Sequence, residues 1–189
     1  IIQSMVAKHN PCPQHHECSL KICFSLFIAT QAAWDSVKKI RGFAALRRAI
    51  VPDLIPADLE KRICLFQHFT GPGFGPFART QDLFGDGSIR LVELPGHAAG
   101  QIGAIVQSDS TQRKFLVADA IWTRRTIEQE LKLTRPFKML ASDKKETQET
   151  KERLVQFAKK YPAVEILPTH CPDVAKKYGF DAMIRERAD

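Results

Sequence analysis

Short apolar runs bounded by polar or turn-forming residues recur along the chain and predict β-strands. They cover residues 24–30, 63–69, 88–94, 101–107, 114–118 and 164–167. Apolar positions at helical spacing predict helices over residues 31–41, 42–50, 123–131 and 144–160. The last of these has an apolar stripe that should pack on the outside of a sheet. The mixture of strands and helices indicates an α+β fold.

Three polar residues each follow one of these strands. They are His97 in LPGHAAGQIG, Asp119 in KFLVADAIW and His170 in EILPTHCPD. A strand end would aim each of them into a shared cleft. Imidazole and carboxylate are ligands that zinc prefers in hydrolytic sites, and a carboxylate can bridge two ions while each histidine holds one. The layout therefore predicts a metal site.

Plainer interpretations stay open for several of these positions. His97 follows Pro95-Gly96 and could cap a turn. A buried carboxylate needs a cation or hydrogen-bond partners, so Asp119 could instead cap a helix that begins near Thr123. Trp122 either forms the wall of a substrate pocket or packs in the core. The loop TGPGFGPF, residues 70–77, either lines the site entrance or only connects strands.

The PGH loop (residues 95–100), the Asp after a strand and the late His after another strand resemble the metallo-β-lactamase-fold hydrolases. The spacings of 22 residues from His97 to Asp119 and 51 from Asp119 to His170 are similar to those of the N-acyl-homoserine-lactonase-like branch. The resemblance covers roughly residues 24–173. It implies an αββα sandwich, two sheets with helices outside, and one or two zinc ions held by His97, Asp119 and His170.

The activity implied by the resemblance is hydrolysis of a lactone, ester or thioester. Zinc would lower the pKa of a bound water and stabilise the oxyanion, with Asp119 as the bridging catalytic ligand. Trp122 would contact the substrate.

The family's main ligand cluster, a His-x-His-x-Asp-His loop upstream of the PGH loop, is absent from this sequence. The resemblance places it shortly before the stretch FIATQAAWDSV, residues 27–37. Residues 1–23 form an atypical segment in which His9, His15 and His16 lack that spacing. We therefore expect an N-terminally incomplete metallo-β-lactamase-like domain over residues 24–189. A non-catalytic binding or interaction module is the alternative function, and His9, His15 and His16 as substitute ligands are a third hypothesis.

Length and composition suit one domain, because 189 residues with 44% hydrophobic content can bury one sizeable core. The five cysteines are odd in number and include no C-x-x-C pair, which favours neither a disulfide framework nor a structural zinc site. A reducing cytoplasm fits this pattern best. The chain has no run of 18 apolar residues, which argues against a membrane span.

The net charge of +7 raises nucleic acid as a partner. The basic residues occur as scattered pairs without interleaved aromatic residues to stack on bases, so solvated helix faces explain them better. The expected partner is a small-molecule substrate. Exposed edges of an incomplete first sheet would also favour pairing with a second copy of the chain.

Overall fold

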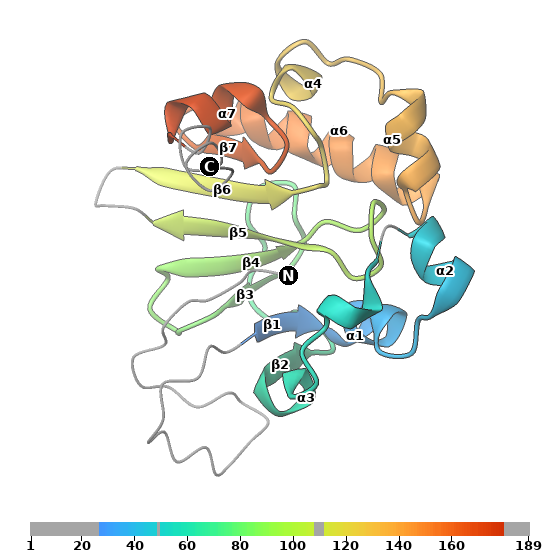
Figure 1. Ribbon diagram of the computed structural model, residues 1–189. Helices are drawn as coiled ribbons and strands as arrows, with labels where there is room; N and C mark the ends of the chain where they lie inside the picture. Colours follow the sequence, from blue (N-terminus) through green and yellow to red (C-terminus); the bar gives the residue numbers. More distant parts are fainter. Residues whose placement is uncertain (1–26, 49, 108–111, 180–189) are drawn as a thin grey trace.

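The computed structural model describes residues 27–48, 50–107 and 112–179. Within these residues the strands form two sheets (Figure 1). One is the parallel pair β1–β2, and the other has five strands in the order β3-β4-β5-β6-β7. The strands are β1 (Phe27–Thr30), β2 (Ile63–Phe66), β3 (Thr80–Asp82), β4 (Ile89–Glu93), β5 (Ile102–Gln107), β6 (Arg113–Ala118) and β7 (Glu165–Pro168).

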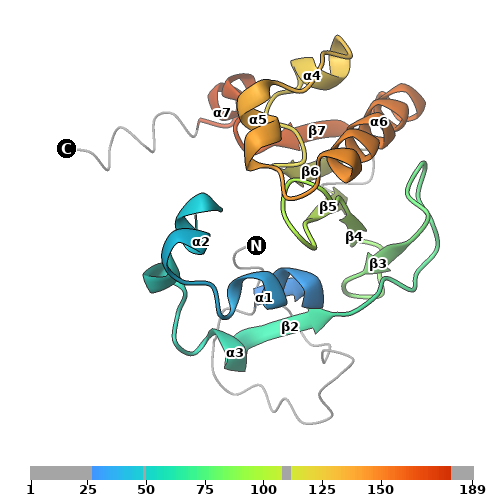
Figure 2. The same ribbon diagram turned by 90° about the vertical axis from the view of Figure 1, so that its right-hand side faces the viewer.

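The helices divide between the two sheets. Figure 2 shows α1 to α3 beside the two-stranded sheet and α4 to α7 beside the five-stranded sheet. They are α1 (Gln31–Val37), α2 (Gly42–Arg47), the 3-10 helix η1 (Pro52–Leu54), α3 (Leu59–Arg62), α4 (Arg125–Glu128), α5 (Arg135–Leu140), α6 (Lys144–Lys160) and α7 (Pro172–Lys177).

Strand directions bring three strand ends to one edge of the five-stranded sheet. Strand β5 is antiparallel to both β4 and β6, while β6 and β7 are parallel. Strands β4, β6 and β7 therefore run in the same direction, and their carboxyl ends share an edge. The loops that follow these ends carry His97, Asp119 and His170.

Both faces of this sheet are buried. Successive side chains of a strand point to opposite faces, so neighbouring residues of β4 pack on different sides. On one face, Val92 of β4 and Phe115 of β6 pack with Phe157 of α6. On the other face, Leu91 of β4 packs with Ile28 of β1. Helix α1 contacts β1 and β2 from outside. The resulting layers, helix, sheet, sheet and helix, confirm the predicted α+β arrangement.

Helix α6 has the range that the sequence predicts. Asp143 caps it by accepting hydrogen bonds from the backbone N–H groups of Lys145 and Glu146, at 2.8 and 2.9 Å. Leu154 and Phe157 of its apolar stripe are fully buried against the sheet. Burying such a side chain stabilises the fold by about 1.5–3 kcal/mol. Packing of the stripe therefore fixes α6 on the sheet.

Five elements are absent from the sequence prediction: η1, α3, β3, α5 and α7. They have three to six residues each, too few to show a period. The predicted helix over residues 123–131 is also shorter in the structure, where α4 has four residues. Short elements of this kind are held by tertiary contacts, which a local pattern does not record.

The glycine- and proline-rich loop of residues 70–77 packs at the carboxyl-terminal end of α6. Phe74 stacks on Tyr161 with ring centroids 5.0 Å apart, and Phe77 lies 5.8 Å from Phe157. The PGH loop instead lies at the start of α6, where the N-capping Asp143 donates its backbone N–H to the carbonyl of Gly96. The 17 residues of α6 span about 24 Å. The hypothesis that this loop lines the site entrance is therefore wrong.

Two of the five cysteines lie in the described residues. Cys171 is buried and free, whereas Cys64 is disulfide-bonded. The cysteine pattern did not favour a disulfide framework, and Cys64 departs from that expectation. The prediction of a reducing cytoplasm therefore loses the support that it took from this pattern. Among the described residues, no helix is long and apolar enough to cross a membrane. His9, His15 and His16 and the proposed segment 1–23 lie outside the described residues.

Candidate functional site

The PGH loop is fixed against the start of α6. The backbone N–H of Ser142 donates to the carbonyl of His97 at 3.0 Å, and that of Asp143 donates to the carbonyl of Gly96 at 2.9 Å. Gly96 has φ +121°, and a methyl group on it would lie 2.2 Å from the backbone nitrogen of Thr147. Only glycine satisfies both conditions. The position of His97 is therefore set by the backbone of α6.

The other end of the PGH loop is held by the first sheet. Thr30, the last residue of β1, donates from Oγ1 to the carbonyl of Gly100 at 2.8 Å. The same hydroxyl accepts from the backbone N–H of Ala33 at 3.1 Å and so caps α1. A methyl group on Gly100 would lie 2.1 Å from this oxygen. The loop is thus clamped between the two sheet-and-helix layers.

Asp119 and His170 meet because β6 and β7 end side by side. The register shifts between Leu116 and Ala118, and Ala118 has φ +47°. The backbone N–H of Thr169 donates to the carbonyl of Ala118 at 3.2 Å, which joins the two loops. Asp119 Oδ1 then lies 3.3 Å from His170 Nε2. This contact has the distance of an ion pair but not the geometry of a hydrogen bond.

The three residues act on one another electrostatically. Burial lowers the pKa of His97, the charge of Asp119 opposes that shift, and His170 adds to it. His97 is therefore neutral at pH 7. His97 Nδ1 and Asp119 Oδ1 are both buried atoms without a hydrogen-bond partner. Leaving such an atom unpaired costs about 1–3 kcal/mol, so the site has unused capacity to bind a polar group.

An aromatic wall stands beside the three residues. The ring of Trp122 lies 6.1 Å from that of His170 and 5.1 Å from that of Phe137. Phe137 is 2% exposed and also lies 5.2 Å from the ring of His97. Sequence reasoning selected Trp122 but missed Phe137 of α5. The signal for α5 was Thr134, which caps the helix, followed by Pro136 in its first turn.

The capping interpretation of Asp119 is wrong. Helix α4 begins after Arg124, which makes no side-chain cap, and Thr123 contacts Thr126. Asp119 Oδ1 has no hydrogen-bond partner. The turn-capping interpretation of His97 also gains no support, because the bond that it makes in the loop is through its carbonyl oxygen and its Nδ1 is unpaired.

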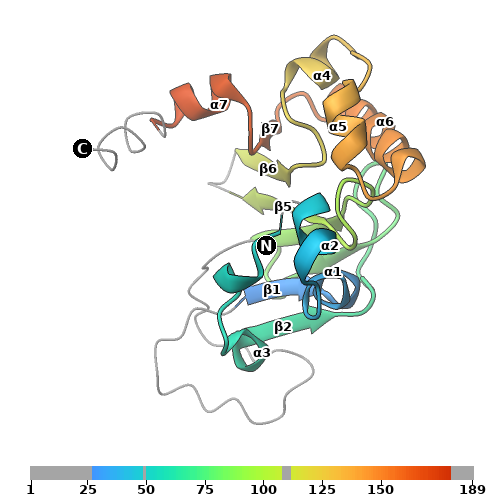
Figure 3. The ribbon, with the colours of Figure 1, turned by 45° about the vertical axis from the view of Figure 1, so that its right-hand side comes forward.

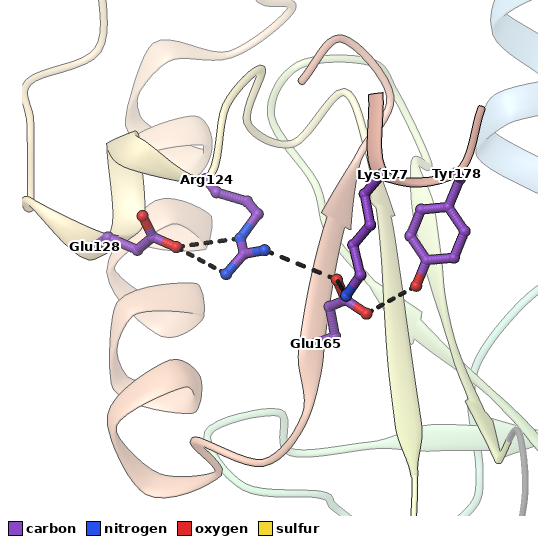
Figure 4. A network of polar contacts seen from close by, with 5 residues as sticks. All are labelled: Arg124, Glu128, Glu165, Lys177 and Tyr178. Atoms are coloured by element: carbon purple, nitrogen blue, oxygen red, sulfur yellow. Dashed lines mark hydrogen bonds and ion pairs between the residues drawn. The ribbon is translucent and has the colours of Figure 1, made fainter. Parts of the chain in front are cut away.

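A polar network at the first residue of β7 ties the segments after Asp119 and His170 to this strand (Figure 4). Glu165 accepts from Lys177 Nζ at 2.6 Å and from the Tyr178 hydroxyl at 2.7 Å, and Arg124 lies 3.7 Å away. Burial alone would raise the pKa of Glu165, but these hydrogen bonds and positive charges outweigh it and hold the pKa below its ordinary value. Glu165 is therefore ionised and holds α7 against the sheet.

The chain was compared with family models, curated proteins and solved structures. No family model and no curated protein matches it. An N-acyl homoserine lactone hydrolase, solved with N-hexanoyl-L-homoserine bound at its catalytic metal centre, aligns with TM-score 0.55 and 15% identity over 79% of this chain and 48% of its own. A probable metal-dependent hydrolase from Staphylococcus aureus aligns with TM-score 0.54 and 15% identity, over 76% of this chain and 44% of the hydrolase. A dizinc quorum-quenching lactonase aligns with TM-score 0.51 and 12% identity, over 77% and 47%.

The chain has the metallo-β-lactamase fold. At 12–15% identity the similarity shows the fold alone. The chain spans about half the length of the solved structures that it matches. The four layers described above are those of the αββα sandwich that the resemblance implied.

This metallo-β-lactamase-fold site does not fit the two-metal centre that the family implies. His97, Asp119 and His170 are donors of the right chemical kind. Within residues 27–48, 50–107 and 112–179, however, no three His, Cys, Asp or Glu side chains form a group placed to hold a metal ion. Two cavities of about 430 and 660 Å³ lie elsewhere, and neither is lined by these three residues.

Proposed function

We propose that His97, Asp119 and His170 form a reduced hydrolase site that engages a small carbonyl compound, a lactone, ester or thioester, and turns it over slowly or not at all. The two unpaired buried atoms, His97 Nδ1 and Asp119 Oδ1, carry this proposal. They are polar and close to an aromatic wall, and neither makes a hydrogen bond, although Asp119 Oδ1 lies 3.3 Å from His170 Nε2. A ligand with a polar group beside an apolar chain would satisfy both features.

The lactonase-like character of the ligand rests on spacing and fold. The distances along the chain between His97, Asp119 and His170 are similar to those of lactone hydrolases, and the solved neighbours include proteins with a homoserine product bound. Trp122 is half-buried and adjoins His170 and Phe137, so it would contact the apolar part of the ligand. These features favour a lactone over other carbonyl compounds.

The proposal is tested with N-hexanoyl-L-homoserine lactone and the full chain. Calorimetry should detect binding that Asp119→Ala abolishes and that the exposed-residue control Asp53→Ala leaves unchanged. Ring opening, followed by proton release, should stay far below ordinary enzyme turnover of 1–10³ s⁻¹. Absence of binding in the native chain, or equal binding by Asp119→Ala, would show that the site does not engage this class of ligand.

Metal-dependent hydrolysis of the same compounds is the second candidate. The two imidazoles and one carboxylate favour it, because this donor set is typical of zinc hydrolases. In the described residues these three side chains do not form a group placed to hold an ion, so an ion would be weakly held and exchange readily. Lactone turnover at ordinary enzyme rates, restored by zinc after chelation and lost in Asp119→Ala, would establish this candidate and refute the first.

Self-association and a cytoplasmic location stay predictions. The two-stranded sheet β1–β2 is an isolated pair in the described residues, and strand edges without partners favour pairing between chains. Size-exclusion chromatography with light scattering should therefore give twice the chain mass of 21.3 kDa. A monomer at all concentrations would refute this expectation.

A further inference from the structure

The junction of β1 and α1, residues 30–36, lies directly against the loop that carries His97. Thr30 is hydrogen-bonded to Gly100 at 2.8 Å. A methyl group on Gly100 would lie 2.5 Å from the backbone nitrogen of Ala33 and 3.1 Å from Cβ of Ala32. Figure 3 shows α1 beneath the loop between β4 and β5. This junction is thus the part of the first sheet that closes the site.

A two-ion hydrolytic centre needs donors from this direction, because His97, Asp119 and His170 are only three residues. A catalytic zinc ion takes three protein ligands and a water, and a two-ion centre needs more ligands than three residues provide. His97, Asp119 and His170 all come from the second sheet. Among the described residues, the β1–α1 junction is a segment that faces the PGH loop from the first sheet, so we expect the remaining donors there.

The side chains of Gln31, Ala33 and Ser36 are not imidazoles, and the polar side chains of the junction make local hydrogen bonds or ion pairs. Gln31 Nε2 donates to Asp35 Oδ1 at 3.0 Å, and Asp35 also pairs with Lys38. Ser36 Oγ donates to the carbonyl of Ala33 at 2.7 Å. An amide, a methyl and a hydroxyl group therefore stand where imidazoles would be required.

We infer that the missing ligands of the metal centre belong to this junction and not to the segment before residue 27. Imidazoles at positions 31, 33 and 36 would rebuild the centre. The run Gln31-Ala32-Ala33-Trp34-Asp35-Ser36 has the spacing of His-x-His-x-Asp-His, with Asp35 at the position of its Asp. The native site is then free of metal because its first-sheet half lacks ligands. This inference rests on the proposed function only in taking His97, Asp119 and His170 as the ligands that follow strands of the second sheet.

The test is the zinc content of the full chain carrying Gln31→His, Ala33→His and Ser36→His together. After dialysis against buffered zinc, elemental analysis should rise from near zero in the native chain to about two ions per chain. Adding His97→Ala to this variant should remove most of that zinc. A matched control places three imidazoles in or just after α1 at positions without this spacing, as Ala32→His, Lys38→His and Lys39→His. It should hold no more zinc than the native chain.

Three results would overturn the inference. They are two ions in the native chain, equal zinc in the matched control, and no increase in a folded triple variant. If circular dichroism shows that the triple variant is unfolded, the pair Gln31→His and Ala33→His replaces it, and a tenfold tighter zinc affinity than the native chain is required. The zinc measurement uses no lactone, so its failure would leave the lactone-binding result of the proposed function intact. Failure of lactone binding would likewise leave the zinc result intact.

Discussion

Replacing Gly96 by alanine should release the PGH loop from α6. At φ +121° an alanine is strained, and its methyl group would lie 2.2 Å from the backbone nitrogen and 2.5 Å from Cα of Thr147. These are main-chain atoms of a 17-residue helix packed on the sheet, so they cannot move aside as a flexible side chain could. The loop must shift instead.

The magnitude follows from the backbone strain and the bonds that the shift breaks. Holding a non-glycine residue in a sparsely populated backbone region costs about 1–3 kcal/mol. The bonds from Asp143 to the Gly96 carbonyl and from Thr150 to the Pro95 carbonyl each contribute about 1 kcal/mol. Gly96→Ala should therefore lower the free energy of unfolding by about 3–5 kcal/mol, which corresponds to a fall in Tm of about 6–20 °C for a chain of this size.

Gly85→Ala is the matched control, because Gly85 also has positive φ, +77°, but a methyl group there meets nothing within 4 Å. Its cost should be the backbone strain alone, about 1–2 kcal/mol. Urea unfolding followed by circular dichroism gives both values. If Gly96→Ala is no less stable than Gly85→Ala, the loop is not clamped against α6 as the structure describes.

Further predictions concern the aromatic wall, the network at β7 and the clamp on α1. Phe137→Ala should lower the free energy of unfolding by about 3–5 kcal/mol and shift Trp122 fluorescence to the red. Met139 lies on the same helix but is 82% exposed, so Met139→Ala should change stability by less than about 0.5 kcal/mol. Equal effects of the two variants would show that Phe137 does not pack in the aromatic wall. Glu165→Gln should lower stability by about 1–2 kcal/mol at pH 7. The pKa of Glu165 lies below its ordinary value of 4.5, so its contribution to stability is complete above that pH and is lost as the pH falls through the lowered pKa. The difference in unfolding free energy between native chain and variant should therefore shrink only in acid. A difference that stays constant from pH 7 to pH 3 would exclude this. Thr30→Ala should cost about 1–2 kcal/mol and Thr30→Ser much less, since serine keeps the hydroxyl, and equal losses would show that the hydroxyl is not used.

The sequence predicts those elements whose pattern is long enough to show a period. Residues 144–160 have a buried stripe and a capping Asp143, and the structure has the same helix. The strands before His97, Asp119 and His170 were recognisable because each is a buried apolar run between turns. Helix α5, with Phe137, is six residues long and therefore shows no period.

The meeting of the site residues is a tertiary property. Asp119 and His170 approach each other because β6 and β7 are parallel neighbours and because Ala118 has positive φ, neither of which a local pattern records. The contact between Thr30 and Gly100 joins residues 70 positions apart. The missing ligands were therefore expected before residue 27, whereas the contact between Thr30 and Gly100 places residues 30–36 against the loop that carries His97.

Zinc content decides whether this site is free of metal. It is determined by elemental analysis of the native chain and of Asp119→Ala, after purification without added metal. We expect little or no zinc in the native chain and no change in the variant. About two ions per native chain, lost in Asp119→Ala, would show instead that a complete two-metal centre forms in this protein.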